Sequence, residues 1–101
     1  MNATIKSISA TCLLLLATTL LKAQVGIGTS SPQASAKLDI TASDKGILIP
    51  RVSLTGTNDV ATIAHPATGL LVYNTATAGS ATLAVEPGFY FFDSNWKMLS
   101  S

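Results

Sequence analysis

The sequence predicts a mostly β protein: a small module of short strands with a C-terminal hairpin and at most one short helix, after an N-terminal signal peptide helix. Three observations support this fold class. An apolar run occupies the start of the chain, a period-two alternation of apolar and polar residues extends from Ala34 to Ser43, and two aromatic-rich segments flank a turn near the C-terminus. We divide the chain into a signal peptide, residues 1–23, and a β-rich module, residues 24–101.

The first 23 residues have the pattern of a secretory signal peptide. Lys6 gives a weakly positive start, Cys12–Leu21 is an apolar run, and Ala23 is a small residue at a predicted cleavage site. As a helix, this run would reach about 15 Å, half of the roughly 30 Å of a bilayer core. We therefore predict an exported chain with no membrane span after cleavage, in preference to an uncleaved anchor or a buried helix. Periplasm, cell surface and extracellular medium all remain open.

Composition after the signal excludes several function classes. The only cysteine, Cys12, lies in the predicted signal peptide, where it precedes the leucine run and so does not suit lipid attachment. The module therefore lacks disulfides and thiol nucleophiles. Acidic and basic residues nearly balance and form no basic stripe, which argues against nucleic-acid binding. A domain this small, without disulfides or an evident metal site, usually gains stability by oligomerising.

The clearest strand signal lies between Ala34 and Ser43. Its alternation predicts a half-buried strand whose apolar face is narrow, because that face is mostly alanine. Because alanine side chains are short, another surface must approach this face closely to bury it. Residues 43–46 are typical of a turn, and Ile47–Ile49 predicts a short, strongly buried strand that ends or bulges at Pro50.

The rest of the module alternates loops and short strands. Asn58 is expected to cap a single helical turn over residues 59–63, which Pro66 prevents from continuing. Leu70–Tyr73 predicts a buried strand and Ala81–Val85 a weak one. The chain then closes as a hairpin, in which Phe89–Phe92 pairs with residues 96–99 across a turn at residues 93–95.

No segment carries the chemistry of an enzyme. Gly26–Ser31 is glycine-rich but lacks the third glycine of the dinucleotide pattern and the terminal Gly-Lys-Ser/Thr of a phosphate loop. His65 stands beside Pro66 without an acidic neighbour, so we expect a surface loop residue. Asp39 and Asp44 are expected to be solvated charges or to form a lone salt bridge, not a catalytic carboxylate pair. We predict no catalytic, cofactor-binding or metal-binding residues, and no cofactor.

The aromatic cluster of the hairpin has two interpretations. Strand alternation must bury at least half of the rings, which favours a hairpin core. Any ring left exposed would offer a ligand or partner contact, for example a platform on which sugars stack. The candidates for such a contact are Tyr90, Phe92 and Trp96.

Five segments in fixed order are distributed along nearly the whole chain after the signal: Gln24–Pro32, Ala34–Ile40, Lys45–Arg51, Pro66–Thr75 and Gly88–Lys97. Together they resemble the head module of exported fibre-like proteins of Bacteroidetes, which are compared with phage tail fibres and trimeric adhesins. This resemblance implies a β-rich exported module that associates as an intertwined trimer. It implies no catalytic residues.

We therefore expect a non-enzymatic structural or adhesive module that self-associates, as a homotrimer, at or beyond the cell surface. A surface glycan or another exported protein would be its further partner. The residues expected on self-associating strands are Ala34, Ala36, Leu38, Ile40, Leu70 and Val72. The alternative is a monomeric β-sandwich that binds carbohydrate through the C-terminal aromatic hairpin.

Overall fold

The computed structural model describes residues 23–99. These residues are β-rich, as the sequence predicts, and they form two compact units divided between Gly46 and Ile47. We call residues 23–46 the N-terminal unit and residues 47–99 the C-terminal unit. The predicted signal peptide, apart from Ala23, lies outside the described residues.

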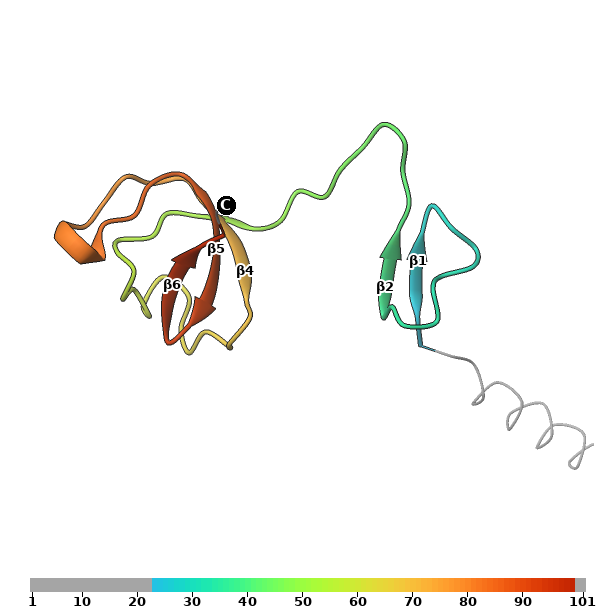
Figure 1. Ribbon diagram of the computed structural model, residues 1–101, viewed down its shortest axis with the longest axis horizontal. Coiled ribbons are helices and arrows are strands. Elements are labelled where there is room, and N and C mark those ends of the chain that lie inside the picture. Colours follow the sequence, from blue (N-terminus) through green and yellow to red (C-terminus); the bar gives the residue numbers. More distant parts are fainter. Residues whose placement is uncertain (1–22, 100–101) are drawn as a thin grey trace, which may run out of the picture. The chain divides into compact units, whose positions relative to one another are not determined.

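The N-terminal unit is built on two short parallel strands, β1 (Val25–Ile27) and β2 (Leu38–Ile40) (Figure 1). Hydrogen bonds from the Val25 amide to the Lys37 carbonyl and from the Thr41 amide to the Ile27 carbonyl, both 2.8 Å, close the two ends of the pair. A parallel pair needs a crossover connection. Here residues 28–37 make that crossover without a helix.

The crossover is held against one face of the β1–β2 pair. A side chain at Gly26 would place its Cβ 2.6 Å from the Thr29 carbonyl oxygen and 2.8 Å from the Pro32 ring, so only glycine allows this approach. The side-chain amide of Gln24 donates hydrogen bonds to the backbone carbonyls of Gln33 at 3.0 Å and Ala36 at 2.8 Å. These contacts fold the crossover back over β1.

The predicted strand over residues 34–43 is much shorter than expected. Only Leu38–Ile40 are in a strand, while Ala34 and Ser35 form a turn. The partner β1 has three residues, so it offers no ladder for a longer strand. The side-chain amide of Gln24 also donates hydrogen bonds to the backbone carbonyls of Gln33 and Ala34, which lie before the strand.

The C-terminal unit is a four-stranded sheet in the order β3-β4-β5-β6. Its strands are β3 (Arg51–Val52), β4 (Leu71–Asn74), β5 (Gly88–Asp93) and β6 (Asn95–Met98). β3 runs parallel to β4, and the other neighbours are antiparallel (Figure 1). The predicted hairpin and the predicted strand around residue 71 are confirmed.

One face of this sheet carries the core. The buried apolar side chains are Leu54, Val72, Val85, Tyr90, Phe92 and Trp96. Four of them come from β4, β5 and β6, whereas Leu54 and Val85 come from irregular segments. The second layer of the core is therefore made of loops, and the segments around residues 53–65 and 76–87 supply it.

Three expectations for this unit are wrong. Ile47–Ile49 forms no strand, and Ile47 and Leu48 are 65% and 76% exposed instead of buried. The predicted strand 81–85 is a 3-10 turn, η1 (Ala81–Leu83), followed by a single bridge from Val85 to Ala78. In place of the predicted helical turn over residues 59–63, residues 61–64 form a turn without helix.

These errors have physical reasons. The alanine at position 81 adopts a positive φ of 53°, which interrupts an extended backbone. At the expected helical turn, the buried Asp59, not Asn58, supplies the cap: its carboxylate accepts the amides of Ala61 and Thr62, both at 2.9 Å. This Asx-type turn satisfies the amides without a helix.

Asn74 joins three segments of the C-terminal unit. The side chain is fully buried; its oxygen accepts the Leu54 amide at 3.0 Å and the Ala76 amide at 3.1 Å. Its nitrogen donates to the carbonyls of Ala76 at 2.8 Å and Glu86 at 2.9 Å. A buried polar group that uses its hydrogen-bonding capacity in this way fixes the position of the loops it binds.

We expect Asn74→Ala to lower the free energy of unfolding by about 2–4 kcal/mol, because it leaves buried backbone groups without partners. Urea denaturation followed by Trp96 fluorescence, at matched protein concentration, measures this loss. Asn58→Ala, at an exposed turn position, is the control and should change stability by less than about 0.5 kcal/mol. Equal stability of the two variants would show that the Asn74 bonds do not hold the loops.

Candidate functional site

The N-terminal unit presents a continuous aliphatic surface. In the parallel register Val25 pairs with Leu38 and Ile27 with Ile40, so these four side chains lie on one face, which we call the aliphatic face. They are 36–54% exposed. The opposite face holds Gly26 and Asp39; the Asp39 carboxylate accepts the Gln33 amide at 2.9 Å. The crossover thus covers one face and leaves the aliphatic face open.

The residues predicted to self-associate are spread over different environments. Leu38 and Ile40 lie on the aliphatic face, but Ala34 and Ala36 precede β2 and line a shallow pocket beside Gln24. Val72 is 2% exposed and belongs to the core of its own unit, against which Leu70 packs from outside. The folded chain therefore leaves only the β2 members of this set on an apolar surface.

The three aromatic candidates belong to the core of the C-terminal unit. Tyr90, Phe92 and Trp96 are 3%, 8% and 1% exposed. Phe92 and Trp96 pack edge to face with ring centroids 5.1 Å apart. The Trp96 indole donates a hydrogen bond of 2.7 Å to the Asp59 carbonyl. A sugar that stacks on a ring needs an exposed ring face, and these three rings offer none in this unit.

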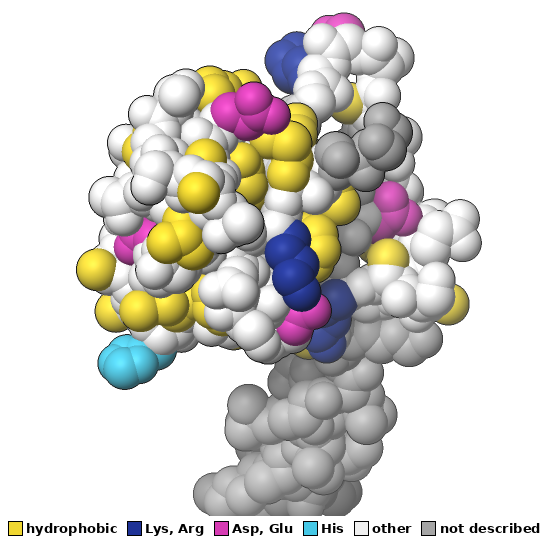
Figure 2. Space-filling view, turned by 60° about the vertical axis from the view of Figure 1, so that its left-hand side comes forward, with side chains coloured by type: hydrophobic (Ala, Val, Ile, Leu, Met, Phe, Trp, Pro, Cys, Tyr) yellow, Lys and Arg dark blue, Asp and Glu magenta, His cyan; other side chains and the backbone are white. Residues whose placement is uncertain are grey.

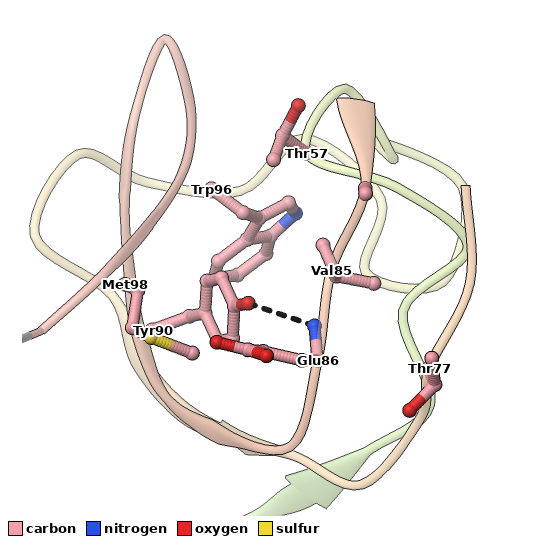
Figure 3. A pocket seen from close by; sticks show the side chains of 8 residues that line it. Thr57, Thr77, Val85, Glu86, Tyr90, Trp96 and Met98 are labelled. Atoms are coloured by element: carbon pink, nitrogen blue, oxygen red, sulfur yellow. Dashed lines mark hydrogen bonds between the residues drawn. The ribbon is translucent and has the colours of Figure 1, made fainter. Parts of the chain in front are cut away.

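A pocket of about 390 Å³ borders two of these rings. Figure 3 shows Trp96 and Tyr90 along one side, with Met98 next to Tyr90 and Val85 on the opposite side. The Glu86 amide donates to the Tyr90 hydroxyl at 3.1 Å, so that hydroxyl is already engaged. The pocket thus has an apolar wall and few free polar groups, and it shows no constellation for catalysis.

The carboxylate of Asp59 has a strongly perturbed environment. Burial alone raises the pKa of Asp59, because it disfavours the charged form. Hydrogen bonds from the Thr62 hydroxyl and from the amides of Thr62, Thr55 and Ala61 outweigh burial and hold the pKa well below its usual range. The hydrogen-bond partners of this carboxylate are Thr55, Ala61 and Thr62, so its role is to cap the 55–62 loop.

Other candidate chemistry is dispersed. Between residues 23 and 99, no three His, Cys, Asp or Glu side chains lie together in a way that would hold a metal ion. His65 is exposed on a bend, and Asp44 pairs with its neighbour Lys45 at the surface. The same described range contains no helix long and apolar enough to span a membrane.

Sequence reasoning missed two features of the site. It did not place Val25 and Ile27 on a strand beside Leu38 and Ile40, because a parallel pairing across a ten-residue crossover leaves no local signal. It also did not use the fact that Leu70–Tyr73 and Phe89–Phe92 are apolar at every position. Strands that are apolar on both faces are typical of sheets covered on both sides.

Short strands, a loop-built core and an open aliphatic face are features of a structural module whose N-terminal unit leaves an apolar surface exposed. Comparison with protein families agrees: residues 26–101 match the model of the phage tail-like trimerisation region. The match covers most of the chain, and the protein belongs to this family. It is a phage tail-fibre-like, trimerising structural module. Searches of curated proteins and of solved structures gave no significant match.

We expect the C-terminal unit to lose stability in acid through Asp59. The lowered pKa means that the carboxylate contributes stability above about pH 4, and that this contribution is lost as the pH falls further and the group is protonated. Relative to Asp59→Asn, the wild-type protein should therefore lose its advantage progressively as the pH falls below about 4. Thermal unfolding followed by Trp96 fluorescence at a series of pH values tests this.

Asp93→Asn serves as the matched control, since Asp93 makes only an exposed pair with Lys97 at 3.2 Å. It should follow the wild-type pH dependence closely. A constant difference between wild type and Asp59→Asn at every pH would contradict the assignment.

Proposed function

We propose that this chain is an exported structural or adhesive module that acts as a homotrimer at or beyond the cell surface, without enzymatic activity. The family match over residues 26–101 is the observation that carries the proposal. The apolar run before Ala23 supports export, and the ordered resemblance to Bacteroidetes fibre heads supports the surface role. A surface glycan or another exported protein is the proposed further partner.

The aliphatic face is the proposed trimer contact of the N-terminal unit. Parallel sheets normally occur only where both faces are covered, and a two-stranded sheet is marginal by itself in water. Here the crossover covers one face, and Val25, Ile27, Leu38 and Ile40 are left on the other. Three copies that bring these faces together around an axis would supply the missing layer.

The free energy expected from burying the aliphatic face is large for a unit of this size. Completing the burial of a half-exposed Val, Ile or Leu contributes about 1 kcal/mol. Each chain would thus gain about 4 kcal/mol from the four side chains, before the entropic cost of association. This gain is comparable to the whole stability that a single small core supplies.

We expect protein purified after expression of the full sequence to have the mass of three chains by light scattering. Leu38→Lys should raise the concentration at which half of the chains are trimeric by at least tenfold, because it places a charge in the aliphatic face. Ser30→Lys, on the exposed crossover, should leave that concentration within twofold. A well-folded wild-type monomer at micromolar concentration would overturn the proposal.

Export has its own test. We expect full-length chain expressed with a C-terminal tag to leave the cytoplasm and to begin at Gln24 by N-terminal sequencing. Leu15→Arg interrupts the apolar run and should retain the uncleaved chain inside the cell, whereas Asn2→Ser should be processed normally. Uncleaved wild-type protein in the cytoplasmic fraction would contradict export.

A further inference from the structure

The second face of the four-stranded sheet has an apolar centre that the C-terminal unit itself leaves exposed. Because strand residues alternate, the face opposite the core carries Leu71 and Tyr73 on β4 and Phe89 and Phe91 on β5. Its charged side chains are Arg51 on β3, Asp93 at the end of β5 and Lys97 on β6. Phe89 is 47% and Leu71 is 42% exposed. Large apolar side chains at this exposure are unusual when they adjoin one another.

The segment before β3 extends this surface. Ile47, Leu48 and Ile49, together with Arg51, Tyr73 and Phe89, enclose an almost wholly apolar pocket of about 370 Å³. Tyr73 and Phe89 form its floor as an edge-to-face pair with centroids 5.1 Å apart. Figure 2 shows hydrophobic side chains in several places on the visible surface, with basic and acidic side chains beside them. We call the set Ile47, Leu48, Leu71, Tyr73, Phe89 and Phe91 the outer face.

We propose that the outer face is a second subunit contact, on which another copy of this chain packs its own outer face within the trimer. This inference rests on the proposed trimer and assigns residues of the C-terminal unit to it. The family match spans every strand of the four-stranded sheet, so this sheet lies within the trimerisation region.

The size of the outer face favours a further copy over an unrelated partner. Its exposed apolar area is on the order of 500 Å², at the upper end of the patches found on monomers. A stable independent partner normally needs about 800 Å² on each side. The outer face is therefore too small to hold a partner alone, but it suffices as one part of an interface that the aliphatic face also holds.

Its charge distribution fits contact between identical chains. Side chains that lie next to a three-fold axis meet their counterparts in the other copies, so an unpaired charge there would meet its like. The six outer-face side chains are uncharged, and Lys97, beside Phe91 on the edge strand β6, is paired with Asp93 at 3.2 Å. Arg51, at the edge of the pocket, turns its guanidinium back to the Ile49 carbonyl at 3.1 Å, which directs the charge to its own backbone.

The test measures trimer dissociation by sedimentation equilibrium in two outer-face variants of the full-length expressed chain. Phe89→Glu and Leu48→Glu should each raise the concentration at which half of the chains are trimeric at least tenfold. Leu48 is 76% exposed and outside any strand, so its substitution leaves the fold intact even if Phe89→Glu does not. Trp96 fluorescence reports that the core has formed.

Leu83→Glu is the matched control, since Leu83 is 43% exposed on η1 and lies outside the outer face. Its concentration of half-trimerisation should stay within twofold of the wild-type value. If folded Phe89→Glu and Leu48→Glu also change the concentration at which half of the chains are trimeric by less than twofold, the outer face is not a subunit contact. A partner that binds the wild-type protein but not these trimeric variants would then be the occupant of the outer face. That result would contradict only the assignment of the outer face, because the variants would still be trimeric. A monomeric wild-type protein would instead contradict the proposed function.

Discussion

The constraint on which this structure depends is that each apolar strand has two faces and the chain covers only one. β4 and β5 are apolar at nearly every position, yet the loops that form the second layer pack against Val72, Tyr90 and Phe92 alone. In β1 and β2 the crossover covers the glycine side and leaves four aliphatic residues open. Each unit, taken by itself, therefore has one apolar face that needs a further surface to cover it.

The covered side is held by polar contacts more than by regular structure. Trp96 illustrates this: its indole binds the Asp59 carbonyl and its amide binds the Thr57 carbonyl, both at 2.7 Å. The 55–62 loop is thereby attached to the C-terminal hairpin at two points. Asn74 makes a similar junction between Leu54 and Glu86. These bonds replace the second sheet that a β-sandwich would have, which is why so few strands suffice to bury a tryptophan completely.

The sequence predicted the fold class, β4 and the hairpin, because alternation and turn residues act over a few positions. In the hairpin, Ser94 takes the positive φ of 63° that a tight reversal requires. It failed at Ile47–Ile49, since an apolar run indicates that burial is needed but not whether the same chain or another supplies it. It also failed at Asn74, whose burial depends on partners far away in the sequence, such as Leu54. The Asp59 carboxylate binds only near neighbours, but its loop is held to the distant Trp96 through the Asp59 carbonyl.

The same reasoning explains why the candidate site was only half predicted. Leu38 and Ile40 were identified from local alternation, whereas their neighbours Val25 and Ile27 join them only through the parallel register. A surface assembled in this way exists only once the crossover has folded, so association through it depends on folding. A small core supplies a few kcal/mol, and in the proposed trimer the covered faces add an amount of the same order. In that trimer, association is part of the folding free energy of the chain.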